Sequence, residues 1–285
     1  MDLTSIKTIK EILKKQGIQP SKRLGQNFLI NKKVLFKIIS SADITKKDII
    51  LEIGPGLGTL TLEIAKKAKK VITVEKDPKM IEILKETLKN FKNVKIIQGD
   101  ILKYNFQSIF NFQFSKKYKI VANLPYYIVS PVIRKFLESK YPPKEMFLMV
   151  QKEVAQRICA KPPKMSILAV AVQFYAEPKI LFKGSKGSFW PQPKVDSAFL
   201  KIKPFSKPKE VNPDLFFKIV KAGFSHPRKQ LANNLSKGLA LSPPNGLKLD
   251  KEQIKTLLLD IGIEPSIRAE VLTIDNWIKL TKAFK

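Results

Sequence analysis

Cysteine and histidine are almost absent from this 285-residue chain, which contains one of each, Cys159 and His226. A single cysteine cannot form a disulfide within the chain, so nothing points to an oxidising compartment. Structural zinc sites use four cysteine or histidine ligands, and two such residues cannot supply them. We therefore predict neither a disulfide nor a bound metal.

Long apolar runs are also lacking. The longest run, residues 167–176, is interrupted by Gln173 and falls well short of the ~20 residues of a membrane-spanning helix. The N-terminus has no apolar core of a signal peptide, and no arginine precedes Arg23, which argues against a mitochondrial transit peptide. These absences predict a cytoplasmic protein that does not associate with a membrane, and we expect a monomer.

Acidic residues are scarce, because 24 Asp and Glu stand against 53 Lys and Arg, giving a formal net charge of +29. This excess favours a polyanionic partner, with nucleic acid ahead of a membrane surface. Only five of the basic residues are arginine, although recognition of base edges and phosphates usually favours arginine. The lysine excess therefore predicts non-specific attraction to phosphates, and it is as typical of a compositional bias or a heat-adapted surface.

Short apolar runs alternate with helix-like segments between residues 48 and 150. This rhythm predicts right-handed crossovers and a mostly parallel sheet. Two later apolar runs have no obvious helix between them and predict an antiparallel pair at the edge. The seven predicted strands are 49–53, 71–75, 94–98, 119–122, 146–150, 180–183 and 197–203, and the helices among them are 59–69, 78–90 and 130–139.

The composition changes after residue 203. Residues 204–213 contain three prolines, which is typical of a linker. Helix-like patterns follow at 214–224, 228–237, 251–261 and 274–283, interrupted by the turn Ser-Pro-Pro-Asn-Gly at 242–246. We predict an α/β domain over residues 1–205 and a small helical domain over residues 206–285.

Glycine and carboxylate residues follow three successive predicted strands. Gly54, Gly56 and Gly58 follow the first, where they permit a sharp turn and close approach of a ligand to the backbone and to the N-terminus of the next helix. Glu75 ends the second strand, where a carboxylate can accept both hydroxyls of a ribose. Asp100 follows the third strand and can accept a hydrogen bond from the amine of an adenine. Together they predict a crevice for an adenosine-bearing ligand, either NAD or S-adenosylmethionine.

The fourth predicted strand ends in Asn123-Leu124-Pro125-Tyr126. The Asn123 amide oxygen and the Leu124 backbone carbonyl are suitable acceptors for the two hydrogens of a planar NH₂ group. Pro125 fixes the turn that directs this carbonyl, and Tyr126 offers a ring for stacking on a base. This combination predicts a site where an exocyclic amine reacts.

These four strand ends resemble the class I S-adenosylmethionine-dependent methyltransferases that modify the amino nitrogen of adenine. Further segments make the chain similar to the small-subunit rRNA adenine N6-dimethyltransferases over about residues 20–240. The segments are Arg23–Leu29, Gln151–Arg157, Trp190–Ser197 and Phe224–Asn234. The resemblance implies a Rossmann-like, mostly parallel seven-stranded sheet with a small C-terminal helical domain that recognises rRNA.

The resemblance also implies a role for individual residues. Asn27 and Leu29 are expected to close over the methionine end of S-adenosylmethionine, and Gly54 with Gly56 to approach its carboxylate and amino groups. Glu75 is expected at the ribose, Asp100 at the adenine, and Asn123 where cofactor and target base meet. Phe189 corresponds to the ring that stacks on the target adenine opposite Tyr126. Arg228 and Lys229 are expected to bind rRNA.

The function implied is dimethylation of the N6 amines of two adjacent adenines in the 3′-terminal hairpin of small-subunit rRNA, with a pre-30S particle as partner. A large-subunit methyltransferase of the erythromycin-resistance type is an alternative with the same chemistry. Residues 224–234, together with Asp196, favour the first. A non-catalytic ribosome-assembly or RNA-binding factor on the same fold is the third possibility, because a fold does not fix an activity.

Overall fold

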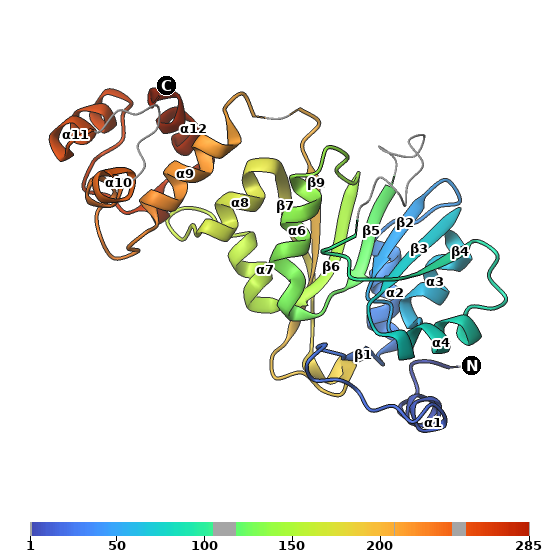
Figure 1. Ribbon diagram of the computed structural model, residues 1–285. Helices are drawn as coiled ribbons and strands as arrows, with labels where there is room; N and C mark the ends of the chain where they lie inside the picture. The colour runs from blue at the N-terminus through green and yellow to red at the C-terminus, as the bar shows by residue number, and fades with distance from the viewer. Residues whose placement is uncertain (1, 105–117, 208, 241–248, 285) are drawn as a thin grey trace. The chain divides into compact units, whose positions relative to one another are not determined.

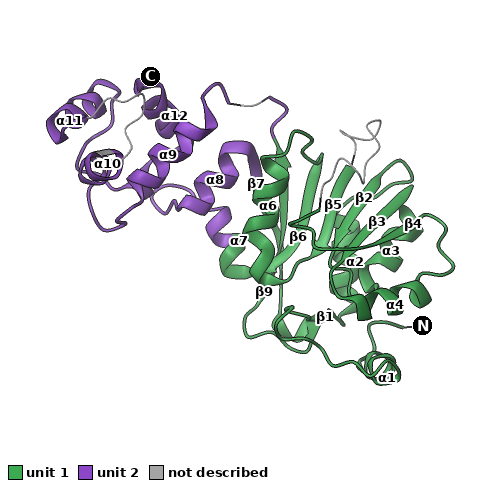
Figure 2. Ribbon diagram, viewed as in Figure 1, with its two compact units in different colours: residues 1–155, 178–204 green, residues 156–177, 205–285 purple. Residues whose placement is uncertain are grey.

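The computed structural model describes residues 2–104, 118–207, 209–240 and 249–284 (Figure 1). It divides into two compact units, the first made of residues 1–155 and 178–204 and the second of residues 156–177 and 205–285 (Figure 2). The sequence places a single boundary near residue 205. The units differ from that division in residues 156–177, which group with the C-terminal helices.

A seven-stranded sheet forms the centre of the first unit, with the strand order β4-β3-β2-β5-β6-β9-β7. Strands β4, β3, β2, β5 and β6 pair in parallel, and β9 is antiparallel to β6. The predicted mostly parallel sheet is confirmed, and β9 and β7 are neighbours at one edge. The strands are β2 (Ile49–Ile53), β3 (Lys70–Glu75), β4 (Val94–Gln98), β5 (Tyr118–Asn123), β6 (Glu145–Gln151), β7 (Ala176–Gly184) and β9 (Ser197–Pro204).

Helices connect the parallel strands, and one of them, α4, begins at residues that favour a helix start. Asp77 accepts a hydrogen bond from the backbone of Lys79 at the start of α4, and Pro78 occupies the first turn. All five residues of β2 are buried, as is typical of a central strand in a parallel sheet. The connecting helices are α3 (Thr59–Lys67), α4 (Pro78–Thr87) and α6 (Val129–Leu137), shorter than predicted by two, three and one residues.

The N-terminal segment adds a second, two-stranded sheet that the sequence did not indicate. Strand β1 (Phe28–Leu29) pairs antiparallel with β8 (Phe189–Trp190), which places Leu29 opposite Phe189. Helix α1 (Ile6–Lys15) precedes β1 and α2 (Lys32–Ser41) follows it. This pairing joins the N-terminal segment to residues about 160 positions later in the chain.

The second unit is helical, as predicted for the C-terminal residues. Its core surrounds the fully buried Trp277, and a Cβ on Gly223 would lie 2.5 Å from that indole ring, so only glycine fits there. The predicted helix at 228–237 instead begins at Leu231, and the predicted turn at 242–246 lies outside the described residues. Its helices are α8 (Ile167–Tyr175), α9 (Pro213–Gly223), α10 (Leu231–Ala240), α11 (Lys251–Asp260) and α12 (Ile274–Ala283), and α7 (Lys152–Ile158) joins the units.

No helix in the described part of the chain is both long and apolar enough to cross a membrane. The described residues also contain no cluster of three or more His, Cys, Asp or Glu side chains suited to holding a metal ion.

A buried lysine on β5, Lys119, connects this strand to the segments that precede β2. The Lys119 ammonium on β5 donates to the backbone carbonyls of Ala42 and Asp43, at 3.3 and 2.8 Å, and lies 3.3 Å from the Asp48 carboxylate. Burial opposes ionisation of Asp48, but hydrogen bonds from Thr45 and the charge of Lys119 outweigh it and lower the Asp48 pKa. The end of α2 and the start of β2 are therefore joined to β5 by one ammonium group.

Replacing this ammonium group should destabilise the fold. Lys119→Met leaves the Asp48 carboxylate and two carbonyls without their donor, so we expect the free energy of unfolding to fall by about 3 kcal/mol. Urea denaturation measures the loss. The control is Lys85→Met, whose ion pair with Glu82 is 61% exposed on both sides and should cost less than about 0.5 kcal/mol. Equal losses in the two variants would contradict a stabilising role for Lys119.

Candidate active site

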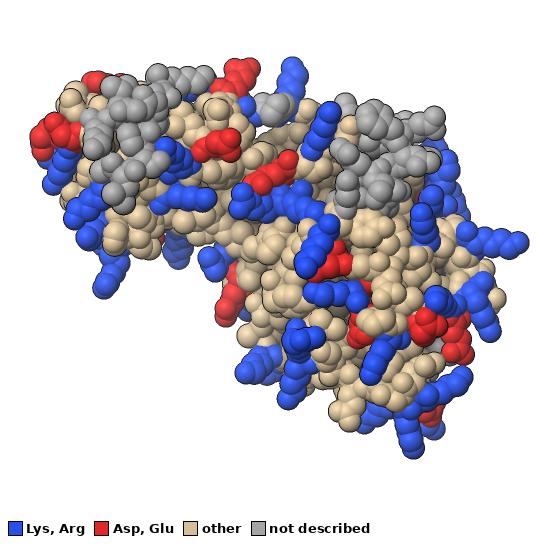
Figure 3. Space-filling model, in the orientation of Figure 1, with Lys and Arg blue, Asp and Glu red and all other residues tan. Residues whose placement is uncertain are grey.

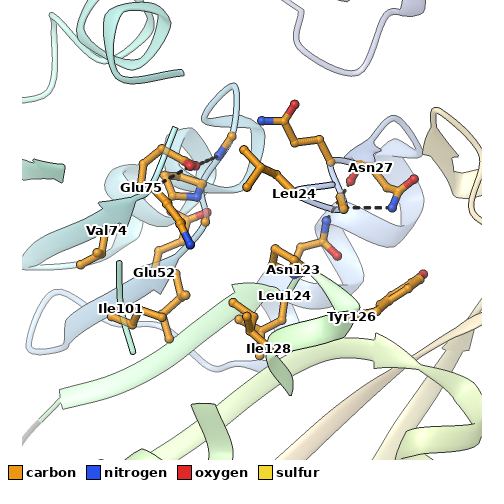
Figure 4. A pocket seen from close by; sticks show the side chains of 18 of the residues that line it. Leu24, Asn27, Glu52, Val74, Glu75, Ile101, Asn123, Leu124, Tyr126 and Ile128 are labelled. Carbon is orange, nitrogen blue, oxygen red and sulfur yellow. Dashed lines mark hydrogen bonds between the residues drawn. The ribbon is translucent and has the colours of Figure 1, made fainter. Parts of the chain in front are cut away.

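A pocket lies at the carboxyl ends of β2, β3 and β5 (Figure 4). The segment that follows β4 also lines it. Ligands of open parallel sheets bind at this edge, because the turns that follow the strands converge there. The lining includes every predicted cofactor and target-base residue: Asn27, Leu29, Gly54, Gly56, Glu75, Asp100, Asn123, Leu124, Pro125, Tyr126 and Phe189. The structure thus brings together residues from six separate parts of the sequence.

The turn between β2 and α3 has a backbone conformation that favours glycine. Gly54 and Gly56 have φ angles of +66° and +58°, which other residues rarely adopt. A Cβ on Gly56 would also lie 3.2 Å from the Phe28 ring, tighter than an ordinary contact. The turn therefore brings bare backbone to the pocket directly before the N-terminus of α3.

The Glu75 carboxylate lies at the end of β3 and accepts three backbone hydrogen bonds. Its oxygens accept from the amides of Gly56 at 3.1 Å, Lys76 at 2.8 Å and Asp77 at 2.9 Å. Burial raises the Glu75 pKa, and these three amides oppose the rise because they stabilise the charged form. Glu75 consequently links the turn after β2 to the turn after β3.

Asp100 forms an ion pair with a residue that the sequence did not single out. The Lys76 ammonium donates to one Asp100 oxygen at 2.9 Å, and the Leu102 amide donates to the other at 3.0 Å. The hydrogen bond from Lys76 is the main reason why the Asp100 pKa is lowered. Lys76 lines the pocket directly after Glu75, and this position was the only signal available in the sequence.

Asn123 is oriented by the N-terminal segment. Its amide nitrogen Nδ2 donates to the backbone carbonyl of Asn27 at 3.1 Å (Figure 4). The oxygen Oδ1 is therefore the end that acts as an acceptor for a ligand. The Leu124 amide donates to the Met149 carbonyl on β6 at 3.2 Å, which fixes the turn that Pro125 continues.

The two predicted stacking rings differ in exposure. Tyr126 is partly buried, and its hydroxyl is 3.0 Å from the Ser197 hydroxyl on β9. Phe189 is only 3% exposed and belongs to the hydrophobic cluster that includes Leu29. Both rings line the pocket, but most of the Phe189 ring packs against the core of the first unit.

Glu52 lines the pocket although it is not among the residues predicted for it. It lies on β2, is 2% exposed, and within the described residues its oxygen Oε2 has no hydrogen-bond partner. Burial, with a smaller contribution from the charge of Glu75, raises the Glu52 pKa to about 8. A carboxylate inside an otherwise apolar strand was the signal in the sequence that pointed to it.

A family model described as ribosomal RNA adenine dimethylase matches residues 3–278. The chain belongs to this family. Membership makes it an rRNA adenine dimethyltransferase with S-adenosylmethionine as methyl donor.

Individual relatives agree with this membership in the dimethylase family. Proteins named ribosomal RNA small subunit methyltransferase A are similar over nearly their whole length. The one from Alkaliphilus oremlandii is 42% identical over 96% of this chain and 95% of its own. The one from Dehalococcoides mccartyi is 44% identical over 95% of this chain and 90% of its own.

Solved structures share the fold of this dimethylase. A dimethyladenosine transferase from Plasmodium falciparum has a TM-score of 0.75 at 30% identity, covering 88% of this chain and 95% of its own. The 23S rRNA methyltransferase ErmE has a TM-score of 0.70 at 23% identity over 90% of this chain and 99% of its own. The second likeness concerns the fold alone.

The polar groups of the pocket fit the methyl donor of the dimethylase family. S-adenosylmethionine offers ribose hydroxyls, an adenine amine, an ammonium group and a sulfonium, all of which are donors or cations. The pocket presents the carboxyl groups of Glu52, Glu75 and Asp100, and the Glu52 oxygen Oε2 has no hydrogen-bond partner within the described residues. The donor set of the ligand and the acceptor set of the pocket are complementary.

The predicted rRNA-binding residues of the dimethylase lie in the second unit and line none of this pocket. Arg228 and Lys229 are exposed on the loop between α9 and α10. The buried Asn234 holds this loop, because its amide donates to the carbonyls of Gly223 at 2.7 Å and His226 at 2.9 Å. His226 is also exposed on this loop and is not among the residues that line the pocket.

The raised pKa of Glu52 predicts a pH-dependent stability. Because its folded-state pKa of about 8 lies above the usual 4.5, the contribution of Glu52 to stability is largest below pH 4.5 and is lost as the pH rises through 8. Glu52→Gln has no such titration, so its stability relative to wild type should grow by roughly 3 kcal/mol between pH 6 and pH 9.

Thermal unfolding of both proteins without ligand, at the two pH values, measures this difference. Glu82→Gln, at a side chain 61% exposed, controls for removal of a negative charge from the same unit. A difference between Glu52→Gln and wild type that stays constant with pH would contradict the raised pKa.

Proposed function

We propose that this dimethylase acts as a monomer in the cytoplasm and dimethylates two adjacent adenines in the 3′-terminal hairpin of small-subunit rRNA within a pre-30S particle. The small-subunit target is supported by the names of relatives 40–44% identical to the chain. Action on large-subunit rRNA, as in ErmE, is the competing proposal, but that protein is only 23% identical.

The pocket geometry supports an assignment of the cofactor-binding residues. Glu75 accepts hydrogen bonds from the ribose hydroxyls, and Asp100 accepts one from the adenine amine. Each Asp100 oxygen already accepts one hydrogen bond, and its second lone pair remains for the ligand. The backbone at Gly54 and Gly56 approaches the carboxylate and amino end. Asn27 and Leu29 form the wall over that end, where β1 pairs with β8.

The observation that carries the proposal is the orientation of Asn123. Its nitrogen is engaged by the Asn27 carbonyl, so Oδ1 is the acceptor for one hydrogen of the target N6 amine, and the Leu124 carbonyl accepts the other. Two acceptors draw this nitrogen away from planarity, which frees its lone pair from the ring. The tip of β5 thereby prepares a weak nucleophile for attack.

S-adenosylmethionine supplies an activated methyl group on a sulfonium, so the chain needs to position the nitrogen rather than activate the donor. Productive alignment brings the two reacting atoms to about 3–3.5 Å. Tyr126 and the edge of Phe189 that lines the pocket hold the extruded base between them. The proton released after transfer passes to water, and no histidine lines the pocket among the described residues.

Dimethylation requires that the monomethylated amine bind again in the same place. After the first transfer one of the two hydrogens is gone, so only one of the two acceptors at Asn123 and Leu124 is used. The first methyl group must then lie against the apolar side chains around Leu124 and Ile128, which line the pocket together. The site can therefore hold either amine without a change of fold.

Loss of the Asn123 acceptor should lower the rate of methyl transfer much more than it weakens the binding of cofactor or RNA. Asn123→Ala removes one acceptor of the N6 amine, and we expect the methyl-transfer rate to fall about 10²–10³-fold, as for removal of a preorganised polar group. The assay uses labelled S-adenosylmethionine and purified 30S particles that lack the modification, with 50S particles alongside. Label is expected as dimethyladenosine on the 30S particles alone.

Tyr126→Phe is the matched control, because it keeps the ring and removes only the hydroxyl that contacts Ser197; its rate should stay within a few-fold of wild type. Label on 50S particles would establish the large-subunit alternative instead. Binding of cofactor and RNA without transfer to either particle would indicate an assembly factor that has lost the reaction.

The second unit is proposed to dock the dimethylase on the particle through Arg228 and Lys229. Exposed basic residues on a loop held by the buried Asn234 suit contacts to phosphates at fixed positions. Replacing both by Glu should weaken binding to 30S particles at least tenfold and leave the affinity for S-adenosylmethionine unchanged.

Sedimentation with the particles at several salt concentrations measures this binding. The control replaces Lys279 and Lys282, which are exposed on α12 of the same unit, by Glu. If both double variants weaken binding equally, the effect comes from net charge and the loop has no specific role.

A further inference from the structure

A basic groove lies beside the active-site pocket in the first unit. Helix α1, the segment after it and the residues that follow β8 form its walls. Gly25, Gln26 and Asn27 line both the groove and the pocket. The two cavities are therefore adjacent and share one short stretch of backbone.

Four exposed lysines line this groove. Lys10 and Lys14 come from α1, Lys22 follows that helix, and Lys194 lies on the opposite wall. No carboxylate lines the groove within the described part of the chain, and none of the four lysines has an ion pair there. The Lys10 ammonium is 5.8 Å from the centre of the Trp190 ring, which also lines the groove.

The wall shared with the pocket is held in place by hydrogen bonds. The Gln26 side chain accepts from the Ser21 amide at 2.8 Å and donates to the Asp77 carboxylate at 2.9 Å. Across the groove, Trp190 stacks on Phe28 with the ring centres 6.5 Å apart. The lysines thus project from a frame that needs little rearrangement to bind a ligand.

We propose that this groove binds the backbone phosphates of the RNA strand that adjoins the target adenine. The inference rests on the proposed function, because it takes an adenine of an RNA chain as the occupant of the neighbouring pocket. When the target adenine occupies the pocket, the nucleotides next to it in the RNA lie at the pocket entrance, beside the wall that the pocket shares with the groove. Lysine suits this task, since ammonium groups attract phosphates without reading the sequence.

The test removes one lysine from each wall. Lys14 and Lys194 have no described contact that the fold needs, so the double variant Lys14→Gln/Lys194→Gln should fold normally. Each phosphate contact to a single strand contributes about 0.7 to the slope of log affinity against log salt, so this slope should fall by about 1.4. At 0.15 M salt this corresponds to binding weaker by about tenfold. KM for the RNA should rise accordingly, with kcat unchanged.

The matched control is Lys69→Gln/Lys92→Gln, two exposed lysines that precede β3 and β4 at the opposite end of the strands. Binding is measured to unmethylated 30S particles and to the protein-free hairpin RNA. A slope equal to that of the control on both substrates overturns the groove proposal. A fall confined to whole particles overturns the strand next to the target adenine as the occupant and indicates another part of the particle.

The wild-type arm separates this inference from the proposed function. Methyl transfer by wild type to 30S particles, with an unchanged slope for the groove variant, contradicts the groove alone. Absence of transfer and binding with wild type contradicts the proposed function and the groove proposal together.

Discussion

Three backbone amides converge on one buried carboxylate, that of Glu75, and the form of the pocket depends on them. The amide of Gly56 comes from the turn after β2, and those of Lys76 and Asp77 come from the turn after β3. Burial of a charged carboxylate is costly, and hydrogen bonds of this charge-assisted kind offset the cost. The side chain of Asp77 in turn caps α4 and accepts a hydrogen bond from the side chain of Gln26. The turn that Glu75 holds is thereby also connected to the N-terminal segment.

Much of this arrangement was predictable, because it depends on local patterns. The apolar run of β2 is bounded by a charged residue and a glycine turn, and its observed bounds equal the predicted 49–53. The strand ends at Glu75 and Asn123 are recognisable because a polar residue interrupts each run. The carboxyl ends of parallel strands meet at one edge, so correct strands bring the correct side chains together.

Other parts depend on contacts between distant residues, which a local pattern does not reveal. Strands β1 and β8 contain two residues each, too few for a periodicity. The ion pair of Lys76 with Asp100 follows only from the packed fold. Residues 156–177 group with the second unit, because their apolar face packs against the C-terminal helices and no linker marks the change.

The pairing of β1 with β8 also has a consequence for synthesis of the protein. Phe28 and Leu29 emerge from the ribosome early, but their partners Trp190 and Phe189 are made about 160 residues later. Strand β9, which pairs with β6, follows later still. The glycine turn and the tips of β3 and β5 exist in the growing chain before this wall does. At the usual rates of translation the gap lasts about 10–30 s. A nascent chain of this enzyme thus holds most of its catalytic residues while it still lacks one side of the chamber in which they work.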